Sequence, residues 1–365
     1  MQPSTPAPST PQFFVNVWVD AFFIGGLTLL SYLGLAAAAA FSATPDWIGT
    51  LAAALLVVGN WPHFAATSLR LYGRRENMAQ YPLTASVVPA FMALTVWAAF
   101  CYPDVVAPYL IKVFLIWSPY HFSGQTTGIT MIYARRAGFQ ISPSARRALA
   151  MFIYGTFLVA TARAESSPDG GSFYGIRYPG FGIPPIAATL LELTMWGGGA
   201  LFLFHVLRWW RAQPKLFHPI ILLPAVTQAV WFVAGPTNPS FYIFVPFFHS
   251  CQYLLIAWAM QLAEKSESHP EAATPRVLLR ASVIWGAGVI AGGSALFWLL
   301  PRVCAQLSDA PLDFSLGVVI AAVQVHHFFV DGVIWKLRRR TVVQPLMSNI
   351  PQLFFHTARE SRVSS

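Results

Sequence analysis

Histidines within apolar segments are the residues of this sequence with the clearest chemical potential. His326, His327 and Asp331 lie in an apolar run that ends at a basic cluster beginning with Lys336. Three other apolar segments carry one histidine each, namely His63, His121 and His249. Ionisable groups at bilayer depth are costly and usually serve a function. Because neutral imidazole binds Fe, Cu, Zn and Ni, these five histidines predict a metal site.

The last apolar segment pairs one histidine with a carboxylate. His327 and Asp331 are four residues apart, so on a helix they share a face. Carboxylates commonly orient metal-bound imidazoles, which predicts that Asp331 orients His327. His326 points about 100° away from His327 on a helix, so both stay candidates and His327 is preferred.

Polar residues near the other histidines are candidates for contacts with substrate or for proton transfer. Gln125 follows His121 by four residues, and Tyr253 follows His249 by four. Glu192 is the one other carboxylate deep in an apolar segment. We therefore predict Gln125, Tyr253 and Glu192 as catalytic residues beside Asp331, with Glu192 also a candidate ligand.

The composition indicates which elements carry these residues. Of the 365 residues, 56% are hydrophobic, 15% are aromatic and only 10% are charged, whereas soluble domains have about 25% charged residues. This predicts an all-α, polytopic integral membrane bundle. The net charge of +9 comes from short patches between apolar segments, as in cytoplasmic loops, and it does not indicate nucleic-acid binding. The three scattered cysteines form no CxxC, which argues against a disulfide framework or a thiolate metal site.

Ten apolar segments are long enough to predict transmembrane helices. They are residues 14–41, 47–69, 83–101, 106–133, 147–163, 184–207, 217–235, 241–263, 277–300 and 314–336. Lysine and arginine concentrate in every second connection, which predicts that both termini are cytoplasmic. Residues 13–340 would form the transmembrane domain, with a disordered N-terminal tail at 1–12 and a cytoplasmic C-terminal tail at 341–365.

In this numbering, the five candidate histidines fall on even-numbered helices. His63 is on the second, His121 on the fourth, His249 on the eighth, and His326 and His327 on the tenth. These helices run in the same direction through the membrane. The histidines would lie about 10–24 Å from the inner border, and helix tilt can bring them to one level.

Three histidine segments resemble a known family. His121-Phe-Ser-Gly124 is similar to its His-Phe-Gly segment, and His249-Ser-Cys-Gln-Tyr253 to its His-Ser-x-x-His segment. His63-Phe-Ala-Ala-Thr67 is a looser counterpart of its His-Gly-x-x-Asp segment. The family is that of the bacterial integral-membrane carotene-cleaving dioxygenases of the Brp/Blh, retinal-forming type. Tyr253 stands where that family has a histidine ligand.

The resemblance implies a non-haem iron enzyme in a bacterial inner membrane. It would use dioxygen on a lipophilic, lipid- or carotenoid-like substrate, either as a dioxygenase or with an external redox partner. Copper or zinc could replace iron. Two alternatives remain open, a haem-binding or quinone-linked electron-transfer protein and a transporter whose polar residues line a pathway.

Overall fold

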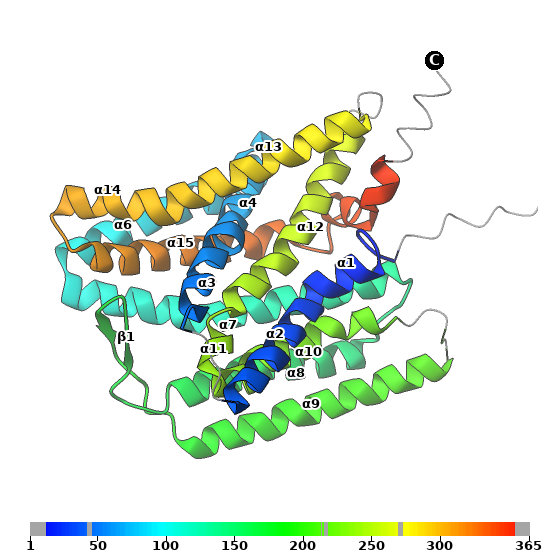
Figure 1. The fold of residues 1–365 in the computed structure, drawn as a ribbon, viewed down its shortest axis with the longest axis horizontal. Coiled ribbons are helices and arrows are strands. Elements are labelled where there is room, and N and C mark those ends of the chain that lie inside the picture. The colour runs from blue at the N-terminus through cyan, green and yellow to red at the C-terminus, as the bar shows by residue number, and fades with distance from the viewer. Residues whose placement is uncertain (1–11, 42–45, 213, 215–217, 269–272, 355–365) are drawn as a thin grey trace, which may run out of the picture.

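The structure is a computed structural model that describes residues 12–41, 46–212, 214, 218–268 and 273–354. Residues 1–11 of the predicted N-terminal tail and residues 355–365 of the predicted C-terminal tail lie outside the described residues. Within the described part, the fold is all-α apart from one two-stranded antiparallel hairpin (Figure 1).

The helices follow one another with few long connections. The first half contains α1 (Val17–Ala21), α2 (Leu27–Ala40), α3 (Ile48–Leu55), α4 (Trp61–Tyr72), α5 (Arg75–Gln80), α6 (Val88–Cys101), α7 (Pro103–Arg136) and α8 (Pro143–Ala164). The hairpin strands β1 (Gly171–Phe173) and β2 (Ile176–Tyr178) precede α9 (Pro185–Ala212), α10 (Leu223–Ala229), α11 (Pro239–Tyr242), α12 (Val245–Ser268), α13 (Pro275–Ser294), α14 (Leu300–Ser308), α15 (Leu312–Ile334) and α16 (Arg340–Val343). Single π-helical turns, such as η2 (Leu56–Asn60), join several neighbouring helices into longer ones.

Eight helical stretches of the described chain are long and apolar enough to cross a membrane, as expected of an α-helical membrane bundle. They are Val17–Ala40, Ile48–Tyr72, Leu83–Cys101, Pro103–Arg136, Pro185–Ala212, Pro239–Ser268, Pro275–Ser308 and Leu312–Ile334. The two other predicted segments are also helical, but α8 carries three arginines and the region of α10 consists of short pieces. The count of ten crossings and the side of the termini therefore stay predictions.

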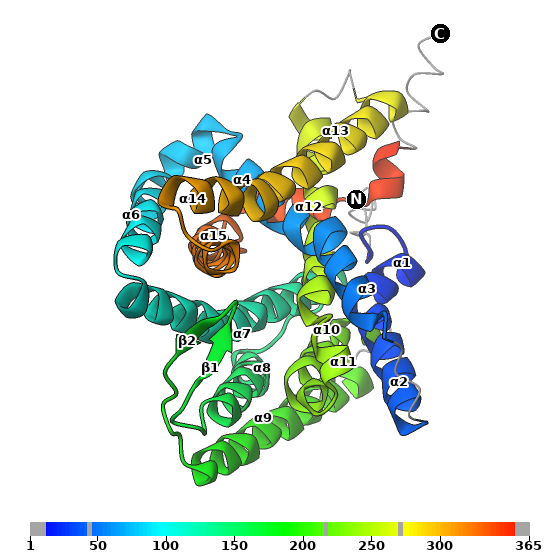
Figure 2. The ribbon, with the colours of Figure 1, turned by 60° about the vertical axis from the view of Figure 1, so that its left-hand side comes forward.

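Two of these stretches are central in the bundle. In Leu312–Ile334 and in Pro239–Ser268, 61% of the most apolar window is buried, compared with 11% in Leu83–Cys101. In Figure 2, α15 appears end-on, enclosed by α6, α7, α4 and α14. Central helices of a membrane bundle can carry polar residues because their faces meet protein rather than lipid. These two stretches carry His249, His326 and His327.

A close helix crossing sets the position of α4. A Cβ atom on Gly293 of α13 would lie 2.5 Å from the carbonyl carbon of Trp61, so only glycine permits this approach of the two backbones. The π turn η2 ends directly before Trp61, and π turns are frequent near functional sites. Together these features hold the segment that contains His63.

At one end of the bundle, Arg136 joins three parts of the chain. Its guanidinium donates hydrogen bonds to the carbonyls of Phe13, Leu346 and Ser348. Val342, Leu346 and Ile350 are buried in the same cluster. The predicted C-terminal tail is thus packed against the bundle as far as residue 354. We call this the basic end, because Arg136 lies here, Lys336 stands between Trp335 and Leu337, which pack on the same cluster, and Arg70 lies 5.0 Å from the ring of Trp335.

Candidate metal centre

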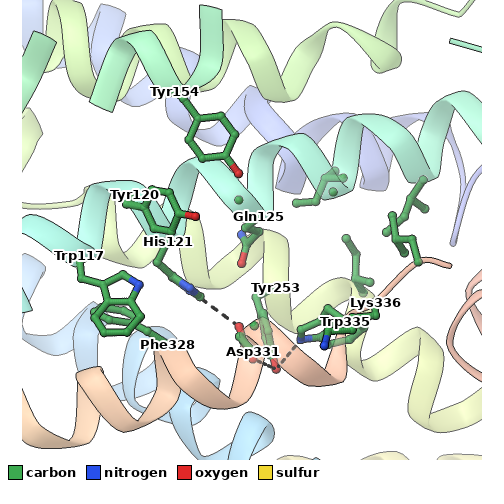
Figure 3. Close-up of a pocket in the computed structure, with 17 residues that line it drawn as sticks. Trp117, Tyr120, His121, Gln125, Tyr154, Tyr253, Phe328, Asp331, Trp335 and Lys336 are labelled. Carbon is green, nitrogen blue, oxygen red and sulfur yellow. Dashed lines mark hydrogen bonds and ion pairs between the residues drawn. The ribbon is translucent and has the colours of Figure 1, made fainter. Parts of the chain in front are cut away.

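Two cavities meet at α7 and α15. The first, which we call the hairpin cavity, has a volume of about 710 Å³ and extends from the histidines to β1 and β2. The second, the basic-end groove, has a volume of about 280 Å³ and runs between α7 and α15 toward Lys336 (Figure 3). His121 and Phe328 line both cavities. The polar residues between them therefore face two separate spaces.

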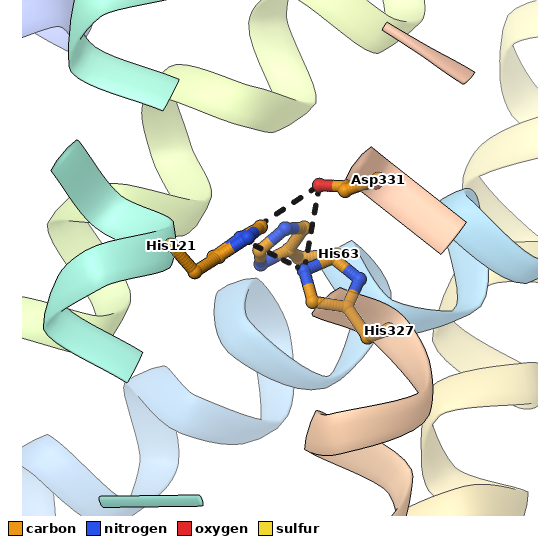
Figure 4. Close-up of side chains that lie close together, drawn as sticks. All are labelled: His63, His121, His327 and Asp331. Carbon is orange, nitrogen blue, oxygen red and sulfur yellow. Dashed lines mark hydrogen bonds and ion pairs between the residues drawn. The ribbon is translucent and has the colours of Figure 1, made fainter. Parts of the chain in front are cut away.

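Four side chains from three helices converge at this place. His63 of α4, His121 of α7, and His327 and Asp331 of α15 each offer a ligand atom, and these atoms all lie within 4.8 Å of one another (Figure 4). His63 and His327 are 1% and 2% exposed, and the side chains of His121 and Asp331 are 9% and 7% exposed. We call this group the His₃Asp cluster.

The distances within the cluster suit a single first-row metal ion. The Nε2 atoms of His121 and His327 are 3.1 Å apart, and Asp331 Oδ2 is 3.7 Å and 3.5 Å from them. Ligand atoms at 2.0–2.1 Å from one ion are about 2.9–3.4 Å apart in tetrahedral or octahedral geometry. His63 Nε2 is buried without a hydrogen-bond partner, as expected of a nitrogen that donates its lone pair to a metal. The residues present therefore fit a metal ion.

Ser250 of α12 sets the protonation of His63. The Ser250 hydroxyl lies 2.8 Å from the carbonyl of Pro246 and 2.9 Å from Asn60 Oδ1, and it donates its single proton to one of these two acceptors. Because the hydroxyl has one proton to donate, it accepts from His63 Nδ1, 3.1 Å away. The proton on Nδ1 leaves Nε2 with the free lone pair that faces the cluster. Ser250 thus selects the tautomer that a metal requires.

A hydrogen-bonded chain orients the carboxylate of Asp331. Thr67 donates to Asp331 Oδ1 at 3.0 Å, the Tyr253 hydroxyl lies 2.6 Å from the Thr67 hydroxyl and 3.3 Å from Oδ1, and Trp335 donates to Tyr253 at 3.2 Å. These contacts occupy Oδ1, so Oδ2 is left to face the histidines. Tyr253, predicted as a catalytic residue, lies beside the cluster as a positioning residue.

His249 lies next to the cluster rather than within it. Its ring is stacked on Phe122 with centroids 3.8 Å apart, and it is 5.0 Å from the ring of His63 and 5.3 Å from that of His121. Both of its nitrogens are buried without a partner. The structure thus brings three of the five predicted histidines into the cluster, and His249 packs beside them.

The remaining predicted residues lie in three different places. His326 points away from the cluster, and its Nε2 pairs with the hydroxyl of Tyr72 at 2.8 Å. Glu192 is not brought to the cluster, because it forms an ion pair with Arg163 at 2.6 Å and its side chain is 31% exposed. Gln125 lines the basic-end groove and donates to the carbonyl of His249 at 3.0 Å.

The orienting residues Thr67, Ser250 and Trp335 were not among the predicted site residues. Thr67 follows His63 by four residues, and Ser250 directly follows His249. The first spacing places two polar groups on one helix face, which was a usable signal. Ser250 contacts His63, which is 187 residues away in the chain. No local sequence pattern could therefore have predicted this contact.

The hairpin cavity is mostly apolar. Its wall includes Phe114, Phe122, Phe232, Phe297, Leu316 and Ile320, and the imidazoles of His63, His121, His249 and His327 border it. At its far end lie Glu165, Tyr174 and Tyr178. An apolar cavity of this size that ends at a few convergent polar groups is typical of a small-molecule site.

Comparison with known proteins gave no assignment, since no family model, no curated protein and no solved structure matches this chain.

Proposed function

We propose that the protein is a membrane metalloenzyme, a non-haem iron oxygenase that acts on a lipophilic substrate. One observation carries the proposal: a buried His₃Asp cluster borders a largely apolar cavity of about 710 Å³ within a membrane-type bundle. Histidines combined with one carboxylate, with positions left open, are typical of non-haem Fe(II) oxygenases. The resemblance of the histidine segments supports iron rather than zinc or copper.

In this proposal the chain supplies ligands, orientation and an apolar environment. His63, His121, His327 and Asp331 would hold the ion, which supplies the binding and activation of dioxygen. Ser250 and the chain from Trp335 to Thr67 keep His63 and Asp331 in their ligating geometry. The hairpin cavity would bind the apolar substrate and exclude water. If the reaction is that of a dioxygenase, both oxygen atoms enter the substrate and no external reductase is needed.

The geometry argues against a haem between His121 and His327. Two axial imidazoles at about 2.0 Å from one iron would place their ligating nitrogens about 4 Å apart on opposite sides of the porphyrin. The Nε2 atoms of His121 and His327 are instead 3.1 Å apart, and Asp331 Oδ2 lies within 3.7 Å of both. Such a cluster has no room for a macrocycle between the two imidazoles.

The test is metal content and absorption of the detergent-purified protein, with the His121→Ala variant and the His326→Ala variant in parallel. We expect about one iron per chain in the wild type and in the His326→Ala variant, no Soret band, and loss of iron in the His121→Ala variant. An oxygen-uptake screen with carotenoids and other polyenes then follows. A Soret band, zinc as the bound metal, or a folded wild-type protein without metal would contradict the proposal.

A further inference from the structure

The basic-end groove has a feature that internal packing does not explain. Gly124 and Gly128 of α7 and Gly332 of α15 line it. A Cβ atom on Gly128 or on Gly332 would meet no atom within 4 Å, and on Gly124 it would meet only the hydroxyl of Tyr154 at 3.8 Å. A glycine within a helix costs about 0.5–1 kcal/mol relative to alanine. These glycines serve no close helix contact, and they keep the groove open.

The groove also holds polar groups that lack partners. Gln125 donates through Nε2 to the carbonyl of His249 and to Gln252 Oε1, while its Oε1 atom is buried without a partner. At the other end, Lys336 is half-buried at the groove. Among the residues that the structure describes, no carboxylate forms an ion pair with Lys336. The groove thus combines a cation without an ion-pair partner among the described residues with apolar and aromatic walls.

The length of the groove along α7 can be compared with the depth of one leaflet of a bilayer. From His121 to Ile132, both of which line it, eleven residues of α7 rise about 16 Å. One leaflet of a bilayer core with a thickness of about 30 Å is about 15 Å deep. The groove therefore spans about one leaflet, from the basic end to the His₃Asp cluster. Gly124 and Gly332 are exposed, and Tyr120 is 48% exposed, so the groove opens sideways toward the surrounding lipid.

We propose that the basic-end groove binds a single-chain lipid with an anionic head group. Lys336 holds the head at the membrane border, and the acyl chain lies over the three glycines with its end at His121 and Phe328. The volume of about 280 Å³ suits one chain rather than two. This binding stands on the groove alone.

Native mass spectrometry of the metal-loaded and the chelator-treated protein in detergent tests the inference. The probes are oleate, oleyl alcohol and oleoyl lysophosphatidate, which share one chain and differ in the head group. We expect one oleate per chain, with weaker binding of oleyl alcohol. Tight binding of oleate alone identifies a fatty acid, and tight binding of the lysophosphatidate identifies a lysophospholipid. Either result supports the anionic site. Equal binding of oleyl alcohol and oleate would overturn it.

Two variants locate the binding. Gly128→Leu fills the groove and should weaken oleate binding at least about tenfold, whereas Gly34→Leu, at another helical glycine with nothing within 4 Å, should not. Lys336→Gln should weaken oleate binding about fivefold and leave oleyl alcohol unchanged. Gly128→Ala, which favours the helix, provides a well-folded second test with a smaller loss. Equal affinities in the Gly128→Leu and Gly34→Leu variants would overturn the inference.

The two proposals fail in different ways. If the protein binds oleate at the groove but holds no metal, the metal centre is wrong and the lipid site stands. If it holds iron but the Gly128→Leu variant binds oleate like the wild type, the lipid site is wrong and the metal centre stands.

Discussion

Two sets of buried polar side chains lie at opposite ends of the hairpin cavity. They differ in how many of their polar atoms have hydrogen-bond partners. At the far end, Lys112 donates to both carboxylate oxygens of Glu165 at 2.6 Å and 2.5 Å. The Lys112 ammonium also lies 4.9 Å from the ring of Tyr178, and Glu165 accepts from the backbone of Phe181. The Lys112–Glu165 pair is therefore satisfied by protein alone.

At the near end, the histidines are not satisfied in this way. His63 Nε2, His327 Nδ1 and both nitrogens of His249 are buried without partners. A buried polar atom without a partner costs about 1–3 kcal/mol. The Lys112–Glu165 pair shows that polar groups inside this bundle can be fully paired by protein atoms. Of the unpaired nitrogens, His63 Nε2 belongs to a residue of the His₃Asp cluster, and it points to a ligand that the protein does not itself provide. His327 faces the cluster through Nε2, so its unpaired Nδ1 lies on the other side of the ring.

The largest expected effect separates two adjacent histidines. His327→Ala removes a ligand atom, so we expect metal affinity to fall at least about 100-fold, more than the loss of an orienting partner causes. His326→Ala, on the same helix but bonded to Tyr72, should keep the metal. Metal analysis after gel filtration measures both. Metal loss in the His326→Ala variant alone would reverse our assignment of the two residues.

The second-largest effect is expected on stability, at the Lys112–Glu165 pair. Lys112→Met leaves the carboxylate of Glu165 buried without a partner, which should lower the free energy of unfolding by about 3–5 kcal/mol. The double variant Lys112→Met with Glu165→Leu should recover most of this loss. Thermal unfolding in detergent measures the change, and metal content should remain at one per chain in the double variant. An undiminished melting temperature in the Lys112→Met variant would show that the pair has no structural role.

A smaller effect tests how His63 is oriented. Ser250→Ala removes the acceptor of the Nδ1 proton, so we expect metal affinity to fall about 10-fold, as for other orienting partners. The control is Ser282→Ala, which removes a membrane-helix hydroxyl that bonds Trp258 far from the cluster. Competition with a chelator of known affinity gives the ratio. Identical affinities in the two variants would show that the tautomer of His63 is set in another way.

The smallest effect is expected at the carboxylate that does not reach the cluster. Glu192→Gln breaks a partly exposed pair with Arg163, and such pairs contribute about 0–1 kcal/mol. We expect an unchanged metal content and a melting temperature within about 2 °C of the wild type. Loss of metal in the Glu192→Gln variant would instead support Glu192 as a metal ligand, as the sequence predicted.

Glu192 and Asp331 show where sequence reasoning reaches its limit. Both are carboxylates deep within apolar segments, so the sequence alone predicts that both are buried in the membrane. Asp331 has a local reason to lie at the site, because the four-residue spacing from His327 places both on one helix face. Glu192 has no such neighbour, and α9 lies at the periphery, where Arg163 of α8 is its partner.

By itself, the sequence determined the helical membrane-type bundle and the helices that carry the histidines. Apolar length and composition depend on the local chain only, and so does the spacing between His327 and Asp331. The preference for His327 over His326 came from its spacing to Asp331, and the structure places His327 in the cluster and His326 against Tyr72.

The hydrogen bonds of Ser250 and Thr67, the two cavities and the place of His249 beside the cluster follow only from the tertiary structure. These depend on how α4, α7, α12 and α15 are packed and rotated against one another. Such packing is the sum of many contacts between residues distant in the chain, and it leaves no periodic trace in the sequence.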